Sequence, residues 1–288
     1  MSDAHPIVWV NGCRQPFDAP HVSARDRGFT LADGVFETML AHNGKVFRLA
    51  DHLARLRGAL GVLDIPAPAD LGPWIDAAVD AGDLAHGVVR VTVTRGVAPG
   101  GLNPPRDPEP TVVVILTPMP PPSPSVYERG VTAHVATGRR NEHAVTAGVK
   151  TLAFTEGIAA TIEAQRAGAD EALMLDVAGH CSEGAASNLF AVAGGTLITP
   201  PLTCGPLPGI TRAVVLALAA RLGISAEERV MTPADLAGAE EAFLTSSFRG
   251  IAPLVRVNGR AIAAGGPGPV TRTLLAAYAA LVAAECGA

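Results

Sequence analysis

The sequence predicts an α+β protein of two domains. β-Branched runs at 88–95 and 111–117 are typical of strands, whereas leucines at helical spacing over 49–63 are typical of an amphipathic helix. The two kinds of segment follow one another without the regular strand–helix alternation of a doubly wound sheet. This irregular order favours the α+β class.

A proline-rich segment, PMPPPSPS at 118–125, predicts where the two domains are joined. It holds five prolines in eight residues, and we interpret it as a stiff linker that contains neither helix nor central strand. The prediction is therefore a smaller α+β domain at 1–117 and a larger α+β domain at 126–288.

The remaining elements follow from local pattern. The first half holds a strand running into an Asn-Gly turn, a hairpin, a helix, and two strands separated by a Gly/Pro/Asn-rich loop. In order these are 7–12, 34–49, 49–63, 88–95 and 111–117, with the loop at 96–105. The second half predicts strands at 131–137, 171–176, 188–194, 196–200 and 241–246, and helices near 156–167, 211–222 and 270–284.

The composition is that of a globular protein, with 288 residues, 48% hydrophobic residues and a net charge of −5. Mild acidity with dispersed arginine gives no support for nucleic-acid binding. No signal peptide and no apolar run of membrane-span length is evident.

The cysteines, Cys13, Cys181, Cys204 and Cys286, form no C-x-x-C pair, which indicates neither a zinc site nor a disulfide framework. We expect a cytoplasmic protein without a metal, a membrane anchor or a nucleic-acid partner.

Lysine usage singles out one residue. The chain has 20 arginines but only two lysines, Lys45 and Lys150. Lys45 falls in the turn of the predicted hairpin, whereas Lys150 lies in the apolar, Gly-flanked stretch GVKTLAFTEG. A lysine amine can lose its proton and attack a carbonyl, which a guanidinium cannot do. Lys150 is either an ordinary surface charge or a nucleophile.

Three further features of the second half could serve one site. Glu183, in HCSEGAASNLF, is either a solvated turn residue or a carboxylate held beside a cation. LPGITR places a helix start near Thr211, where free amides could bind phosphate, although Thr211 could equally be a plain N-cap. The strand EAFLTSS ends in Thr245, Ser246 and Ser247, whose hydroxyls could complete a phosphate cup or simply end the strand.

The chain lacks several familiar catalytic motifs. It has no G-x-x-x-x-G-K-[ST], no G-x-S-x-G and no metal-ligand spacing, so a P-loop and a hydrolase elbow are not indicated. A reactive lysine, a carboxylate and a phosphate cup are what pyridoxal 5'-phosphate (PLP) requires. The combination is compatible with PLP but does not by itself single it out.

A series of motifs along the chain indicates a protein family, which residue spacing alone does not. They are RDRGFTLADGVFET (25–38), FRLADHLARL (47–56), VKTLAFTEG (149–157), GADEALMLDVAGHCSEGAASNLF (168–190), LPGITR (207–212), EAFLTSS (241–247) and GPGPVTR (266–272). In these the chain resembles the class IV (fold type IV) PLP-dependent aminotransferase family over nearly its whole length. The family includes branched-chain and D-amino-acid aminotransferases, (R)-amine transaminases and aminodeoxychorismate lyases.

The resemblance implies roles for named residues. Lys150 is similar to the Schiff-base lysine, Glu183 to the partner of the pyridine nitrogen, Arg48 to the phosphate-binding arginine, and Leu207 to the residue that packs on the ring. The remaining phosphate ligands implied are the amides of Ile210 and Thr211 and the hydroxyls of Thr211 and Ser247. Substrate contacts are expected from Phe36, Thr38, Arg95 and Ser246.

The sequence departs from the family in two places. Ala153 and Phe154 stand where the family often has Asn followed by Tyr or Leu. In RGVAPGG, Gly100 stands where lyases carry a second arginine for a substrate carboxylate, so Arg95 or another arginine would have to replace it. The segments GVFET and VTVTRG are closer to those of the lyases and D-amino-acid enzymes than to those of the branched-chain enzymes.

The resemblance implies a PLP-dependent transaminase that moves an amino group from an amino acid to a 2-oxo acid. A D-amino acid or an (R)-amine is favoured as donor. The alternatives are an aminodeoxychorismate lyase, which releases pyruvate and 4-aminobenzoate, and an L-branched-chain aminotransferase. A third is a dimeric scaffold without catalysis, against which the retained Lys150 and Glu183 argue. The family builds its site at the interface of a homodimer, which we also expect here.

Overall fold

The computed structural model describes residues 5–19 and 21–287, and the chain forms two compact units. Unit 1 is Met1–Pro121, Val149–Ala153 and Val282–Ala288, and unit 2 is Pro122–Gly148 and Phe154–Leu281. Two segments of unit 1 thus come from residues that the sequence assigns to the second domain. The predicted domain boundaries at 117 and 126 remain a prediction. Helices and strands mix in both units, and this confirms the α+β class.

The proline-rich segment is more structured at its ends than predicted. Pro118 is the last residue of strand β6 (Thr111–Pro118), and Pro124 is the first residue of helix α4 (Pro124–Glu128). Ser123 caps that helix by accepting the N–H of Ser125. The expectation of neither strand nor helix is therefore wrong at both ends. Proline is tolerated at the first helical position because the N–H it lacks would have no helical partner there.

Unit 1 is built on a six-stranded sheet with the order β2-β1-β6-β5-β3-β4. Its strands are β1 (Ile7–Val10), β2 (Cys13–Gln15), β3 (Gly34–His42), β4 (Lys45–Val46), β5 (His86–Thr94) and β6. Its helices are α1 (Arg27–Leu31), α2 (Leu49–Val62) and α3 (Leu71–Asp80). Every segment predicted as strand or helix in this half has its counterpart, and α3 is an additional helix.

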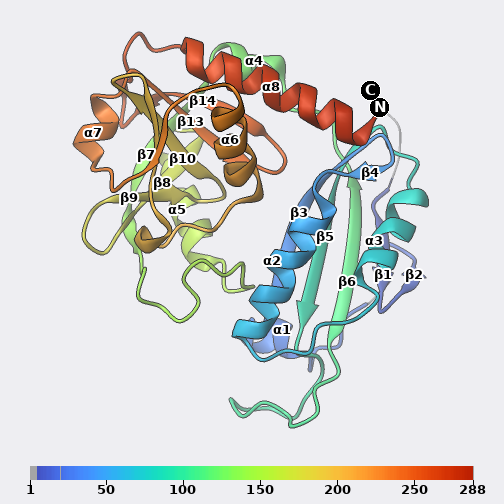
Figure 1. Ribbon diagram of the computed structural model, residues 1–288. Coiled ribbons are helices and arrows are strands. Elements are labelled where there is room, and N and C mark those ends of the chain that lie inside the picture. Colours follow the sequence, from blue (N-terminus) through green and yellow to red (C-terminus); the bar gives the residue numbers. More distant parts are fainter. Residues whose placement is uncertain (1–4, 20, 288) are drawn as a thin grey trace. The chain divides into compact units, whose positions relative to one another are not determined.

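One face of this sheet carries the hydrophobic core of unit 1. Val89, Val91 and Val93 alternate along β5 and pack with leucines of α2 and α3, which lie on that face (Figure 1). Because side chains alternate across a strand, the residues between them face the opposite side of the sheet. The opposite side therefore carries Arg90 of β5 with Phe36 and Thr38 of β3, which is paired with β5.

The segment Val149–Ala153 lies along the free edge of the Gly34–Phe36 stretch of β3. The N–H of Phe36 donates to the carbonyl of Lys150 at 3.0 Å, and the N–H of Leu152 donates to the carbonyl of Gly34 at 3.0 Å. A β-bridge between Val35 and Thr151 completes this short ladder. The main chain thereby places Lys150 beside Phe36.

Unit 2 is built on a nine-stranded sheet. Its strands are β7 (Val131–Arg140), β8 (Glu171–Asp176), β9 (Cys181–Gly184), β10 (Asn188–Ala193), β11 (Thr196–Thr199), β12 (Ala226–Glu228), β13 (Glu241–Ser246), β14 (Gly250–Val257) and β15 (Arg260–Ala261). Besides α4, its helices are α5 (Thr155–Arg166), η1 (Leu202–Cys204, 3₁₀), α6 (Ile210–Arg221), α7 (Pro233–Ala237) and α8 (Pro269–Cys286). No helix within 5–19 and 21–287 combines the length and hydropathy of a membrane span.

This sheet closes on itself. The order β10-β13-β14-β7-β8-β9 returns to β10, because β9 also pairs with β10 through Glu183 and Asn188. The closed ring encloses a hydrophobic core that includes Leu173, Leu189 and Leu254. Closure fixes β9 against strands on both sides, so Glu183 belongs to a strand rather than to the solvated turn that its local sequence also allowed.

Candidate active site

Lys150 of unit 1 lies against an aromatic ring. Its Nζ is 4.2 Å from the centroid of the Phe36 ring, a distance at which a cation interacts with the ring face. Phe36 is buried, and its ring is therefore a fixed surface next to the amine. The structure thus brings together two of the predicted residues, Lys150 and Phe36.

A second cation, Arg90, shares this ring. The Arg90 guanidinium lies 3.9 Å from the Phe36 centroid, and in the strand register Arg90 is directly opposite Thr38. Burial lowers the pKa of Arg90 from its ordinary value. Among the residues that the structure describes, no carboxylate forms an ion pair with Arg90. Arg90 is thus a partly buried cation suited to an anionic ligand.

Arg90 is not among the site residues predicted from the sequence. In VVRVTVTR, the valines at 89, 91 and 93 alternate with Arg90, Thr92 and Thr94. An arginine on the non-core side of such a strand was the available signal, but alternation alone does not tell what the arginine faces.

Arg95, the arginine expected to contact substrate, donates its hydrogen bonds to other residues of the protein. Its guanidinium donates to Asp33 through Nε at 2.8 Å and to the carbonyls of Leu63 and Asp64 at 2.6 and 2.9 Å. Asp33 also accepts from Arg27, and Arg95 is only 8% exposed. The structure therefore gives Arg95 a structural role, and it places Arg90 rather than Arg95 beside Phe36.

Glu183 is a buried carboxylate with two donors. It is 5% exposed, its Oε1 accepts from the guanidinium of Arg140, and its Oε2 accepts the backbone N–H of Leu207 at 2.8 Å. Glu183 therefore lies beside a cation, Arg140, and its role toward a cofactor remains a prediction. The Leu207 carbonyl in turn accepts from the side-chain amide of Asn188 at 2.8 Å. Glu183 of β9 thus binds the N–H of Leu207, and Asn188 of β10 binds its carbonyl.

Helix α6 begins next to this loop with amide donors that no side chain caps. Its N-cap is Gly209, which offers no side-chain cap, and Ile210 and Thr211 form the first turn. Thr211 is thus not the N-cap. A Cβ on Gly209 would come within 1.9 Å of Oδ1 of Asn188, so a larger residue there would displace the Asn188 side chain that donates to the Leu207 carbonyl. The first amides of a helix, uncapped by a side chain, are suited to bind phosphate.

The hydroxyls that end β13 have different surroundings. Oγ1 of Thr245 is buried without a hydrogen-bond partner, and Oγ of Ser246 accepts the N–H of Arg249 at 3.3 Å. Ser247 follows the strand and is partly exposed. Helix α6 packs against β13, so these hydroxyls and the α6 amides belong to neighbouring elements of unit 2.

Arg48 precedes helix α2 in a left-handed conformation, with φ at 58°. Its guanidinium pairs with Glu285 at 2.9 Å and with Asp51 at 3.6 Å, while its Nε is buried without a partner. All three residues belong to unit 1. The phosphate-binding role of Arg48 therefore remains a prediction, and in this structure carboxylates pair with its guanidinium.

These two groups of residues match the chemistry that PLP needs. Unit 2 supplies a carboxylate paired with Arg140 and a helix start with uncapped amides, and unit 1 supplies an amine against a fixed ring. An orphaned hydroxyl at Thr245 adds a polar group without an internal partner. The donor set fits a phosphorylated pyridine, and the assignment of these residues to one cofactor remains a prediction.

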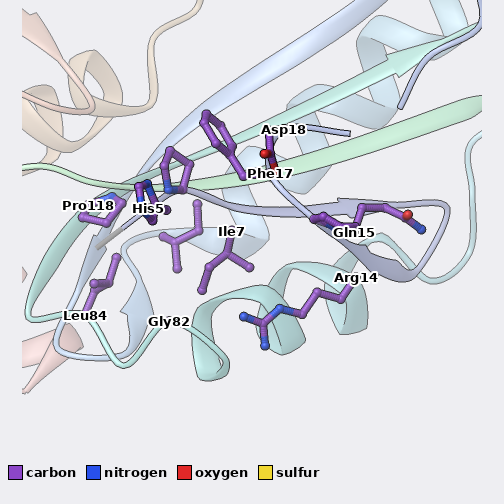
Figure 2. A pocket seen from close by; sticks show the side chains of 12 residues that line it. His5, Ile7, Arg14, Gln15, Phe17, Asp18, Gly82, Leu84 and Pro118 are labelled. Atoms are coloured by element: carbon purple, nitrogen blue, oxygen red, sulfur yellow. The ribbon is translucent and has the colours of Figure 1, made fainter. Parts of the chain in front are cut away.

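A wide groove lies elsewhere in unit 1. Its volume is about 910 Å³, and β1, β2 and the turns around Gly82 and Pro118 line it, with His5, Ile7 and Phe17 at its wall (Figure 2). None of the residues that line it is a candidate for catalysis or cofactor binding. Cavity size is therefore not a guide to the active site in this chain.

Comparison with known proteins identifies the family of this chain. Residues 34–257 match the family model for amino-transferase class IV. A D-alanine aminotransferase of Bacillus licheniformis is 31% identical over 88% of this chain and 89% of its own length. The family match extends from the first residue of β3 to the last residue of β14.

Two solved structures show the same fold. The branched-chain amino acid aminotransferase of Escherichia coli has a TM-score of 0.91 and 28% identity, covering 96% of this chain and 94% of its own. The 4-amino-4-deoxychorismate lyase of Pseudomonas aeruginosa has a TM-score of 0.85 and 34% identity, covering 96% and 98%. The similar proteins therefore carry three different activities.

Proposed function

Because the chain belongs to the class IV aminotransferase family, whose cofactor is PLP, we propose that it moves an amino group from a D-amino acid to a 2-oxo acid. One observation carries the proposal. Lys150, the amine for the chemistry, and Arg90, a cation for a carboxylate, lie on the same Phe36 ring. An amino acid offers an amino group and a carboxylate on one carbon, so it fits a paired amine and guanidinium.

The residues have distinct roles in this proposal. When bound, PLP withdraws electrons from the carbon that carries the amino group. Lys150 would hold the cofactor through its amine, and the same amine would take up and return the proton at the substrate Cα. Glu183 would keep a proton on the pyridine nitrogen, because a buried carboxylate favours a cation beside it. The amides of Ile210 and Thr211, with hydroxyls of Thr211 and Ser247, hold the phosphate.

Arg90 distinguishes between donor classes. A guanidinium binds a carboxylate through two charge-assisted hydrogen bonds, whereas an (R)-amine such as 1-phenylethylamine has no carboxylate to offer. The partial burial of Arg90 strengthens such a pair because the local dielectric constant is low. Arg90 thus supports an amino acid over a simple amine, and the segments GVFET and VTVTRG support the D-series.

A donor panel tests the proposal. The purified holoenzyme is mixed with D-alanine, L-leucine or (R)-1-phenylethylamine and 2-oxoglutarate, and formation of the amino product is followed. We expect D-alanine to give the highest kcat/KM and (R)-1-phenylethylamine the lowest. A preference for L-leucine would make the enzyme an L-branched-chain aminotransferase, and turnover of (R)-1-phenylethylamine above both amino acids would overturn the role of Arg90.

A second candidate is aminodeoxychorismate lyase, which the 34% identity to the P. aeruginosa lyase favours. Its reaction eliminates pyruvate and needs no 2-oxo acid. The test is pyruvate release from aminodeoxychorismate by the holoenzyme without any 2-oxo acid. Release faster than the best transamination rate would replace the transaminase proposal by the lyase.

Two further expectations belong to this proposal. One is a homodimer with the site at the subunit interface, which the family implies, and the other is a cytoplasmic location. Light scattering on the purified protein and fractionation of the source cells test these two expectations separately.

A further inference from the structure

Three side chains of unit 2 that the proposed catalysis does not use converge at one place. Asp176 ends β8, His180 directly precedes β9, and Cys204 ends η1. One carboxylate oxygen, one ring nitrogen and the thiol sulfur lie within 4.8 Å of one another. Carboxylate, imidazole and thiolate are the three ligand types that proteins use for zinc.

The spacing of these atoms suits a tetrahedral ion. Nδ1 of His180 lies 3.2 Å from Oδ2 of Asp176. Two ligand atoms that each lie about 2.0–2.1 Å from a tetrahedral zinc are about 3.3 Å apart. The pair could thus take up zinc with little movement. Asp176 and Cys204 are buried, whereas the His180 side chain is 36% exposed, which gives an ion access from solvent.

The charge around this group is negative and lacks a strong counterion. Within the described part of the chain, neither Asp176 nor the neighbouring Glu142 pairs with arginine or lysine, and the one ion-pair partner of each is a histidine, His180 or His143. Glu142 accepts the N–H of Val177, the residue after Asp176, and its side chain is only 10% exposed. Buried carboxylates are normally paired with a cation or coordinated to a metal.

We propose that Asp176, His180 and Cys204 form a Zn²⁺ site, with water as the fourth ligand. On binding, Cys204 releases its thiol proton to solvent, and His180 coordinates through a ring nitrogen that carries no proton. The soft sulfur and the imidazole select zinc over magnesium and calcium, which prefer oxygen ligands. Although the cysteines lack any C-x-x-C spacing, the fold assembles the ligands from two separate segments, the turn between β8 and β9 and the end of η1.

The position of the site gives it a structural consequence. Asp176 and His180 flank the turn into β9, which carries Glu183, while Cys204 precedes the loop that carries Leu207. Glu183 and Leu207 are themselves joined by a hydrogen bond of 2.8 Å. Zinc would therefore tie together the two segments whose contact holds Glu183, and binding stabilises the folded state by mass action.

The test uses the holoenzyme after chelator treatment. It is dialysed against Zn²⁺ and its zinc is measured by atomic emission, with Co²⁺ as a second probe whose visible d–d band reports tetrahedral geometry. We expect about one zinc per chain, a tetrahedral cobalt spectrum, and a higher melting temperature with zinc.

Cys204→Ser and His180→Gln decide the assignment. Loss of an outer-shell partner weakens metal binding about tenfold to hundredfold, so loss of a direct ligand should weaken zinc binding by more than about tenfold. The matched controls are Cys13→Ser and His143→Gln, an exposed cysteine and a histidine 81% exposed, which should bind zinc as the parent does. Asp176 is left intact because it also accepts the backbone N–H of His180 at 2.7 Å.

Two outcomes would overturn the zinc site. One is a parent protein that retains no zinc after dialysis. The other is zinc binding in His180→Gln equal to that of the parent. His180 is partly exposed, so its variant remains informative if Cys204→Ser fails to fold.

Discussion

Lys150 and Phe36 are joined twice within unit 1. The N–H of Phe36 donates to the Lys150 carbonyl at 3.0 Å, and the Lys150 amine lies 4.2 Å from the centroid of the Phe36 ring. A main-chain hydrogen bond and a side-chain contact therefore both connect Lys150 to Phe36. The amine has a defined place on the sheet face that also presents Arg90.

Replacement of Lys150 by Ala or Arg should leave a folded protein without turnover. Arginine keeps the charge but cannot act as a nucleophile, and Lys45 is the only other lysine in the chain. Steady-state transamination and the visible absorption of the cofactor-loaded protein measure the effect. Lys45→Arg is the control and should behave as the parent. Parent-like activity in Lys150→Ala would sink the assignment of the catalytic lysine.

Arg90→Ala should raise KM for the amino acid while leaving thermal stability close to that of the parent. Hydrogen bonds to charged groups contribute about 1.5–3 kcal/mol, so kcat/KM should fall about tenfold to hundredfold. Arg95→Ala is the contrasting variant, because it removes one of the two arginines that donate to Asp33 and leaves the carbonyls of Leu63 and Asp64 without this donor, so it should lower stability. An unchanged KM in Arg90→Ala would remove Arg90 from substrate binding.

Glu183→Gln should retain PLP but turn over about a hundredfold more slowly, which corresponds to about 3 kcal/mol of lost transition-state stabilisation. The amide oxygen can still accept the N–H of Leu207, so the fold is kept, but the charge facing Arg140 is lost. The matched control is Glu156→Gln, because Glu156 lies 3.9 Å from Arg140 and its side chain is 63% exposed. Turnover of Glu183→Gln within twofold of the parent would make Glu183 purely structural.

Phosphate holding should be shared among several groups. Thr211→Ala and Ser247→Ala should each weaken PLP binding by about 0.5–1.5 kcal/mol, and Arg48→Ala by more, because its hydrogen bonds are charge-assisted. The α6 amides survive every side-chain change, so no single variant should abolish binding. PLP titration of the apo proteins measures this. Glu285→Gln is the control that removes the carboxylate paired with Arg48. If Arg48→Ala binds PLP as tightly as the parent, Arg48 does not bind the phosphate and serves only in its ion pair with Glu285.

Glu37 should contribute to stability in a pH-dependent way. It is 1% exposed, with Nδ1 of His52 2.8 Å from its Oε2 and Nε of Arg55 2.7 Å from its Oε1. Burial by itself raises the pKa of Glu37, but the hydrogen bonds and charges of His52 and Arg55 outweigh it and lower the pKa from 4.5 to about 2. Because the folded-state pKa is depressed, this stabilisation is present above pH 4.5 and disappears as the pH falls toward about 2.

Glu37→Gln should therefore lower the free energy of unfolding by on the order of 3 kcal/mol at neutral pH. The difference from the parent should shrink between pH 4.5 and about 2. Denaturant titrations at neutral pH and near the lower end of this window test it. A difference that stays constant with pH would mean that lost packing, rather than the charge of Glu37, is responsible.

Local pattern alone determined much of the fold. The alternating valines at 88–95, the leucines over 49–63 and the Asn-Gly turn after β1 each specify their own element, because period and turn chemistry act within a few residues. Helix α3 has the same kind of signal, with Leu71, Ile75 and Ala78 at helical spacing, and was overlooked. The motifs likewise identified the family, since they are read directly in the chain.

Only the tertiary structure decided which side chains meet. Ring closure of the unit 2 sheet turned Glu183 from a possible turn residue into a buried strand residue facing Arg140. Pairing of the Lys150 segment with β3 put its amine on Phe36, and strand register put Arg90 rather than Arg95 on the same ring. These contacts join residues far apart along the chain, and local propensity carries no information about such partners because packing and pairing set them together.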